Sequence, residues 1–362
     1  LSGITNREPI RPANRKEGRF FNNNLWMLED LSLTAEMAQP IKKLNLDALA
    51  NELSQEFSQE RKITVYFAPL HLEEVYVKPD ALIINFFRLQ PDFAGVDKVV
   101  PQALEIGANT FQFFTRNPRG GAARTIGDAE IARWLKARQA ADIAEVCGHL
   151  PYTVNLATDK DNLQEFASMV VADDLRRMSA LSIEYLVLHP GSSGDERQRA
   201  VERIIRLLDQ ALEKVDASAW LLLETMALQG NEIGSIPEIA AIWHGLGRPP
   251  QVGVCLDSCH LFAAGYDFTE PAEVERLLAD LDQHIGLEQV KVLHLNDSKL
   301  PSGSNRDRHA NIGQGEIGEQ GFSNLLSHPF IRQLSWHLET PVETYRDYAQ
   351  EIARVKAIIG AA

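Results

Sequence analysis

The stretch EYLVLHPGSSGDERQRAVERIIRLLDQALEKVDASAWLLLE (184–224) decides the fold class, because it holds two apolar runs separated by one amphipathic segment. The runs EYLVLHP (184–190) and AWLLLE (219–224) have the length and continuous apolar character of buried strands. The segment between them has the pattern of a helix. A strand, a helix and a second strand in this order predict two parallel strands joined by a crossover helix.

The same alternation continues in both directions from residue 81 to the end of the chain. It gives eight candidate strands: ALIINFF (81–87), NTFQFF (109–114), AEVCGHL (144–150), EYLVLHP (184–190), AWLLLE (219–224), VGVCLD (252–257), VKVLHLND (290–297) and SWHLET (335–340). Eight such units over about 280 residues fit an α/β fold of the (β/α)8 TIM-barrel type, which takes ~250 residues. A doubly wound open sheet has the same alternation and remains the alternative.

Residues 1–80 do not share this alternation, so we expect an N-terminal α/β appendage of unknown role, followed by a catalytic barrel over 81–362. The segment 44–60 has leucines and a phenylalanine at three- and four-residue spacing, which predicts an amphipathic helix. The segment KITVYFAPLHLEEVYVK (62–78) could form two short strands. Packing against the barrel and self-association are both open roles for the appendage.

The composition is ordinary for a soluble protein, with 44% hydrophobic and 24% charged residues. No apolar run approaches the ~20 residues that span a bilayer, and the N-terminus lacks the apolar segment of a secretory signal. We therefore expect a cytoplasmic protein. For the oligomeric state, a monomer is favoured. Its three cysteines, Cys147, Cys255 and Cys259, are too few for a disulfide framework and are interpreted as reduced thiols.

Six of the eight candidate strands have, at or near their carboxyl end, a side chain that can bind a metal. These are His149, His189, Glu224, Asp257, His294 and Glu339, and His260, Asp307 and His309 lie in the loops that follow two of the strands. A barrel gathers the carboxyl ends of its strands on one face, where its active sites are built. The nine side chains are therefore predicted to converge.

Taken one at a time, each of these residues has an ordinary structural interpretation. A single strand-end histidine is usually a hydrogen-bonded core residue, and a single carboxylate is usually a helix cap. Three carboxylates buried side by side without cations, however, would suffer desolvation and mutual repulsion. Imidazole mixed with carboxylate suits zinc, or zinc with manganese or iron. A Cys255–Cys259 metal pair is a weaker alternative, since Cys255 has the pattern of a small buried residue within a strand.

Several strings of this sequence resemble the endonuclease IV family of abasic-site endonucleases. They are GANTFQFFTRNPRGG (107–121), HLPYTVNLA (149–157), LVLHPGS (186–192), VGVCLDSCHLFAAGYD (252–267), LHLNDSK (293–299), GSNRDRHANIGQGEIG (303–318) and LET (338–340). They run in the family's order over about residues 95–345, and the strings at 252–267 and 303–318 are highly specific.

The resemblance implies three Zn²⁺ ions per chain, with Mn²⁺ or Fe²⁺ an option at one position. The implied ligand sets are His149, His189 and Glu224 for the first ion; Glu224, Asp257, His294 and Glu339 for the second; and His260, Asp307 and His309 for the third. It also implies that Arg119 and Tyr152 enter the DNA groove at the lesion, and Arg116 and Asn117 share the loop with Arg119.

The activity that the resemblance implies is hydrolysis of double-stranded DNA on the 5′ side of abasic sites, leaving a 3′-hydroxyl. Close metal ions can lower the pKa of a water enough to give hydroxide near neutral pH. Glu224 and Glu339 would act as ligands that also orient the attacking hydroxide. A nucleotide without a base is cheap to extrude into the pocket, which would give selectivity. Lys299, Arg306 and Arg308 could contact phosphates, or could be ordinary solvated loop charges.

The net charge of −14, from 36 basic and 50 acidic side chains, weighs against a nucleic-acid partner. Three divalent cations would reduce it to −8 and concentrate positive charge at one place. Net charge therefore weakens the DNA hypothesis without excluding it.

The sequence departs from the family's pattern around the predicted site. Leu89 stands near a position that the family gives to histidine, and Gly121 replaces a tryptophan. Thr225 and Met226 replace polar residues after Glu224, and Leu228 replaces a glycine. None of these positions is a predicted ligand, but changes around a metal site can cost ~10- to 100-fold in affinity or activity.

Two other functions stay open. A metal-dependent sugar isomerase or epimerase on a related barrel would explain the acidic charge, but would not need the third ligand set. A barrel that only binds damaged DNA or a partner would predict eroded ligands, yet all nine positions are filled.

Overall fold

The computed structural model describes residues 99–361, except 117–122, 124, 142 and 195, together with four short strands before them. The chain divides into two compact units, Leu1–Phe93 and Ala94–Ala362. In the first unit, β1 (Trp26–Met27) pairs in parallel with β2 (Ile63–Thr64), and β3 (Glu74–Lys78) pairs antiparallel with β4 (Ala81–Asn85). The two strands predicted within 62–78 are thus confirmed as β2 and β3, whereas the predicted helix at 44–60 lies outside the described residues.

The second unit is built on one parallel sheet of seven strands in the order β15-β12-β11-β9-β7-β6-β5. The strands are β5 (Gln112–Phe114), β6 (Cys147–His149), β7 (Tyr185–Leu188), β9 (Trp220–Glu224), β11 (Val252–Asp257), β12 (Val290–His294) and β15 (Ser335–His337). All four residues of β7 and all six of β11 are buried, as expected for parallel strands that are covered on both faces.

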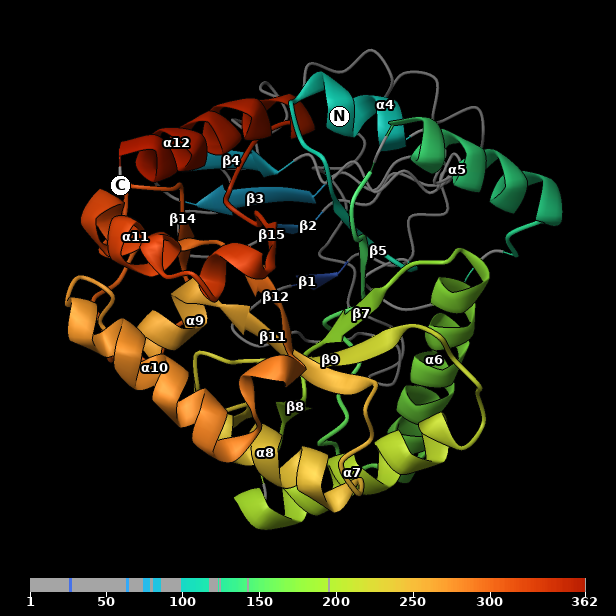
Figure 1. Ribbon diagram of the computed structural model, residues 1–362. Helices are drawn as coiled ribbons and strands as arrows, with labels where there is room; N and C mark the ends of the chain where they lie inside the picture. Colours follow the sequence, from blue (N-terminus) through green and yellow to red (C-terminus); the bar gives the residue numbers. More distant parts are fainter. Residues whose placement is uncertain are drawn as a thin grey trace, which may run out of the picture. The chain divides into compact units, whose positions relative to one another are not determined.

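Helices follow the strands and lie around them in a ring (Figure 1). They are α4 (Val99–Glu105), α5 (Asp128–Ala141), α6 (Asp161–Ala180), α7 (Arg197–Leu212), α8 (Ile236–Gly245), α9 (Ser258–Ala263), α10 (Pro271–His284), α11 (Gly318–Ser327) and α12 (Tyr348–Ala361). In α7 the buried side chains recur every three or four residues, including Ala200, Ile204, Leu207 and Ala211. This spacing puts one apolar stripe of the helix against the sheet.

The described residues of the second unit also form two short antiparallel ribbons and three turns of 3₁₀ helix. One ribbon pairs β8 (Gly191–Ser192) with β10 (Glu232–Ile233), and the other pairs β13 (Asp297–Ser298) with β14 (His309–Ala310). The 3₁₀ turns are Leu287–Gln289, Ile331–Gln333 and Tyr345–Asp347. Within the part of the chain that the structure describes, no helix is long and apolar enough to span a membrane.

The sheet curls until side chains from its two ends meet. Gln112 of β5 donates a hydrogen bond from Nε2 to Oε1 of Glu339, just beyond β15, at 2.6 Å. Deeper in the sheet, Cys147 Sγ of β6 lies 3.3 Å from His337 Nε2 of β15. An open doubly wound sheet would hold its edge strands far apart, so these contacts settle the choice in favour of a TIM-type barrel.

The first of the eight predicted barrel strands, 81–87, is wrong. Its residues Ala81–Asn85 form β4, which pairs with β3 in register from Glu74↔Asn85 to Lys78↔Ala81, outside the seven-stranded sheet. Only two residues separate β3 from β4, so the entropy cost of closing this hairpin is small compared with that of a parallel crossover. The two compact units separate after Phe93. That residues 1–80 are an appendage and residues 81–362 the catalytic domain stays a prediction.

Candidate metal centre

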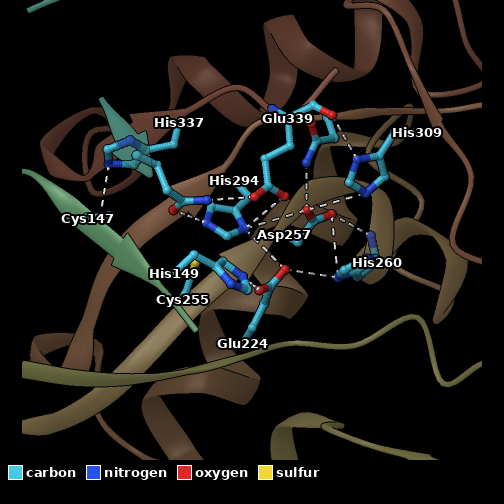
Figure 2. A network of polar contacts seen from close by, with 12 residues as sticks. Cys147, His149, Glu224, Cys255, Asp257, His260, His294, His309, His337 and Glu339 are labelled. Carbon is cyan, nitrogen blue, oxygen red and sulfur yellow. Dashed lines mark hydrogen bonds and ion pairs between the residues drawn. The ribbon is translucent and has the colours of Figure 1, made fainter. Parts of the chain in front are cut away.

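The predicted site residues lie where the parallel strands end. His149, Glu224, Asp257 and His294 are the last residues of β6, β9, β11 and β12. His189 directly follows β7, and Glu339 comes two residues after β15. Because neighbouring parallel strands end at the same edge, their terminal side chains face one another around the mouth of the barrel (Figure 2).

The loops supply the remaining three predicted residues. His260 lies on α9, whose first turn Asp257 caps by accepting a hydrogen bond from His260 N at 2.8 Å. Asp307 and His309 lie at the β13–β14 ribbon, with His309 the first residue of β14. The ligand atoms then form three groups, each within 4.8 Å: His149, His189 and Glu224; Glu224, Asp257, His294 and Glu339; and His260, Asp307 and His309.

Glu224 is the centre of the arrangement. It is completely buried, and four imidazoles surround its carboxylate. Oε2 lies 3.2 Å from Nε2 of both His149 and His189, while Oε1 lies 3.1 Å from His294 Nδ1 and 3.4 Å from His260 Nδ1. Burial opposes ionisation of this carboxyl, but His294 and His189 outweigh it and hold its pKa well below the usual value. Glu224 is thus a buried anion shared by two groups.

The third group has unsatisfied nitrogens. Nε2 of His260 and Nε2 of His309 are both buried and have no hydrogen-bond partner. They face the carboxylate of Asp307 at 3.4 Å and 3.1 Å. Burial favours the neutral imidazole, but Asp257 and Asp307 outweigh it and raise the pKa of His309 to about 9 and that of His260 well above its usual value. Buried nitrogens aimed at a carboxylate without a hydrogen bond fit a cation held between them.

The hydrogen bonds of the histidines also fit metal ligands. Nδ1 of His149 donates to the Leu150 carbonyl at 2.5 Å, and Nδ1 of His260 donates to the Thr225 carbonyl at 2.9 Å. In each ring the acceptor fixes the hydrogen on one nitrogen and leaves the other nitrogen free to bind. The donor set and its surroundings therefore fit divalent cations that prefer mixed imidazole and carboxylate ligands.

Comparison with known proteins places this arrangement in a family. A family model described as a xylose isomerase-like TIM barrel matches residues 100–358. The probable endonuclease 4 of Moorella thermoacetica is 50% identical over 265 residues, which cover 73% of this chain and 95% of that protein. The chain belongs to the endonuclease IV family.

Solved structures agree with this placement. Endonuclease IV from Thermus thermophilus has a TM-score of 0.65 and 34% identity, and the match covers 75% of this chain and 96% of that chain. D-psicose 3-epimerase from Clostridium cellulolyticum has a TM-score of 0.52 at 11% identity, covering 73% of this chain and 91% of that chain. The second likeness shows the fold alone. The predicted family and the predicted TIM barrel are both confirmed.

The structure groups the nine residues into the same three sets that the resemblance to the endonuclease IV family implies. That these sets hold cations stays a prediction. A fourth group joins Asp257 and His309 with Cys259. Cys255 instead lies in the apolar cluster of the barrel interior, and no group among the described residues contains both cysteines. The alternative of a Cys255–Cys259 pair thus has no support in this geometry.

Two residues that support the site were missed from the sequence. The amide of Gln112 contacts both His294 and Glu339. Asn296 is completely buried, donates from Nδ2 to Asp257 Oδ2 at 2.7 Å and accepts from the backbone N–H of Glu339 at 2.9 Å. Gln112 is the polar residue in FQFF, and Asn296 comes two residues after the predicted ligand His294 in LHLN, which is the only signal that the sequence offered.

Three departures from the family's pattern lie at the mouth. Thr225 accepts a hydrogen bond at Oγ1 from the backbone N–H of Asp257 at 3.0 Å, so this residue still supports a predicted ligand. Met226 is buried and lies so close to Gly234 that a Cβ added there would clash with the Met226 side chain. Leu228 has φ = 59°, in the left-handed region that glycine adopts readily and leucine does not. Leu89 and Gly121 lie outside the described residues.

Of the two predicted DNA-contacting residues, the structure describes Tyr152. It is 55% exposed, and its ring packs edge-on against Phe114, which packs in the same way against His149. Arg119 and Asn117 lie outside the described residues. Arg116 is not free to contact DNA, because its guanidinium is buried and paired with Asp173 at 2.7 Å and with Asp174 at 2.5 Å.

Proposed function

We propose that this chain is a metal-dependent DNA-repair endonuclease that hydrolyses the phosphodiester bond 5′ of an abasic site and leaves a 3′-hydroxyl. The observation that carries the proposal is the convergence of nine imidazoles and carboxylates into three ligand groups at one barrel mouth. The names of the endonuclease 4 relatives support a nuclease acting on DNA. Ligand chemistry supports Zn²⁺, with Mn²⁺ or Fe²⁺ as an option at one position.

The three groups defined above would each hold one ion, with Glu224 shared between the first two. When bound, the cations would supply Lewis-acid stabilisation of phosphate charge and would make water a better nucleophile. No serine or cysteine nucleophile is required for such a hydrolysis. The thiols of Cys147 and Cys255 agree with this, because burial raises the pKa of both well above the usual value.

The two carboxylates proposed to orient the attacking water differ in access. The side chain of Glu224 is completely buried, whereas that of Glu339 is 28% exposed. Glu339 can therefore reach a substrate-side water, and we assign it the orienting role. Glu224, enclosed by four histidines, holds the charge and the geometry of the centre.

DNA would be held by groups around the mouth. Tyr152 offers an exposed ring beside the first ligand group, suited to stack on a base next to the lesion. Lys299, Arg306 and Arg308 are all exposed in the segment that joins β13 to β14, and the backbone N–H of Lys299 donates to the Arg308 carbonyl. This local positive charge would contact phosphates despite the overall charge of −14. Arg119 is proposed as the second residue that enters the groove.

A metal-dependent sugar isomerase or epimerase is the second candidate, since an epimerase shares this fold. The third ligand group, with its two unpartnered buried nitrogens, favours the nuclease. A sugar-transforming site of the kind considered above has no need of His260, Asp307 and His309 as ligands.

The test is incubation of the zinc-loaded chain with a labelled duplex carrying one tetrahydrofuran abasic analogue. We expect one nick on the 5′ side of the lesion, a 3′ end that a polymerase extends directly, and loss of the product with a chelator. The same duplex with an intact base is the control. Absence of a nick with zinc, manganese and iron alike would contradict the proposal.

A further inference from the structure

One glutamine at the mouth of the barrel contacts two predicted metal ligands. Gln112 is the first residue of β5, at one edge of the sheet, and it is partly buried. Its amide reaches two predicted ligands that follow it by 182 and 227 residues in the sequence, His294 and Glu339. Both belong to the ligand group that also contains Glu224 and Asp257.

The two contacts require opposite ends of the amide. Oε1 lies 2.8 Å from Nε2 of His294, and Nε2 lies 2.6 Å from Oε1 of Glu339. In the reversed orientation the amide oxygen would face a carboxylate oxygen, which is repulsive. Gln112 therefore donates to Glu339 and accepts from His294, and His294 carries its hydrogen on Nε2.

This assignment leaves particular atoms free on each partner. With Nε2 engaged by Gln112, Nδ1 is the nitrogen of His294 left for the interior of the group, where it contacts Glu224 Oε1 at 3.1 Å and Glu339 Oε2 at 3.3 Å. On Glu339, Oε1 is engaged by Gln112, so Oε2 is the oxygen left for the interior of the group. One amide thus selects the binding atom of two ligands.

Comparison with the other rings shows why this position matters. Nδ1 of His149 and Nδ1 of His260 are fixed by the backbone carbonyls of Leu150 and Thr225, and Nδ1 of His309 lies 3.3 Å from the carbonyl of Glu339. For His294 the corresponding acceptor is a side chain, so a substitution can remove it. No other predicted ligand among the described residues has its ring orientation set in this way by an amide.

We propose that Gln112 is a positioning residue of the metal centre: it sets the tautomer of His294 and the rotamer of Glu339 so that both present one free atom to the same cation. The proposal rests on the metal centre of the proposed function. Loss of such a supporting hydrogen bond typically costs 10- to 100-fold in metal affinity. We expect that loss at the group containing Glu224, Asp257, His294 and Glu339, with the other groups less affected.

The experiment compares the full chain with Gln112→Met, which keeps the length of the side chain and removes both hydrogen bonds. Gln112→Leu is the second variant, in case the first folds poorly. Gln164→Met is the matched control, because the Gln164 amide pairs instead with the Thr158 carbonyl and with Arg206. Zinc affinity is measured by chelator competition, and the visible absorption of the cobalt-loaded protein reports on ligand geometry. Melting in excess chelator reports on the fold alone.

We expect wild type and Gln164→Met to bind the same number of ions with the same affinities. In both Gln112 variants one class of site should weaken about 10- to 100-fold, with a changed cobalt spectrum. Unchanged affinities and spectra in a folded Gln112 variant would overturn the role of Gln112 and leave the proposed nuclease intact. A variant that melts earlier in chelator but binds zinc as wild type does would also overturn it, since Gln112 would then only close the barrel. A wild-type chain that binds no zinc would overturn the metal centre itself.

Discussion

Two layers of side chains in the same barrel, one at the mouth and one just beneath it, have opposite chemistry. On β6, β11 and β12 the last residue is a predicted ligand, and the residue two positions earlier is Cys147, Cys255 or Val292. At the last strand, His337 is the final residue of β15, and the predicted ligand Glu339 follows it by two residues. Since side chains in a strand alternate, residues two apart point the same way. On β6, β11 and β12 the two layers therefore differ in residue type, although the residues of both are buried.

Two histidines show what separates the layers. His337 and His260 are 4% and 2% exposed. Around His337, which neighbours the Cys147 thiol, burial lowers the pKa to about 3, so the ring is neutral. Around His260 the effect of burial is outweighed by Asp257 and Asp307, which raise the pKa well above the usual value. Burial alone makes an imidazole inert, and neighbouring carboxylates turn it into part of a cation site.

The largest effect is expected at the shared carboxylate of the mouth. Glu224→Gln keeps the shape but removes the charge that four histidines surround. We expect nicking of the abasic duplex to fall more than 100-fold, which exceeds the ~10- to 100-fold typical of a supporting residue. Initial rates and zinc content measure this. Glu202→Gln on the outer helix α7 is the control, and an equal loss there would show that the effect is not specific.

A matched pair of substitutions tests the contrast between the layers directly. His260→Leu should remove the zinc of the third group, and a large loss of nicking should follow. His337→Leu, at a neutral buried ring, should leave the zinc content and its affinity unchanged within about twofold, well below the 10-fold expected for a residue that supports the metal. Both are measured by metal analysis after dialysis. Loss of zinc in His337→Leu would contradict the conclusion that only the residues at the mouth take part in metal binding.

Metal removal should lower the thermal stability of the barrel without unfolding its apolar interior. A ligand at 100 times its Kd stabilises the folded state by about 2.7 kcal/mol per site. Chelation should therefore lower the melting temperature of the barrel by several degrees, and added zinc should restore it. The far-ultraviolet circular dichroism at room temperature should stay unchanged, because the apolar interior does not depend on the ions. Collapse of the helical signal on chelation would contradict this.

The smallest effect concerns backbone strain in the loop after Glu224. Leu228 adopts φ = 59°, which costs a residue with a side chain about 1–2 kcal/mol. Leu228→Gly should thus raise the stability by about 1 kcal/mol, or roughly 2–4 °C in melting temperature. Leu228→Ala keeps the strain and should give no gain. Equal melting temperatures for the glycine and alanine variants would show that Leu228 is not strained.

The sequence predicted the parts of this molecule that follow from local periodicity. Seven strands and the convergence of His149, Glu224, Asp257 and His294 could be foreseen, because the carboxyl ends of parallel strands meet on one face of a barrel. The supporting contacts of Gln112 could not, since its partners lie 182 and 227 residues away across the closed barrel. The prediction for segment 81–87 was wrong for the opposite reason. Its apolar run suits a strand of the barrel or of a hairpin, and it pairs with β3, which ends only two residues before β4 begins.

The nine side chains at the mouth of the barrel are proposed to bind three cations. Diffraction from crystals of the zinc-loaded chain, collected on both sides of the zinc absorption edge, tests it most directly. We expect three anomalous peaks, one within each ligand group, with Glu224 between the first two. Peaks elsewhere, or a zinc-loaded crystal without a peak in these groups, would contradict it.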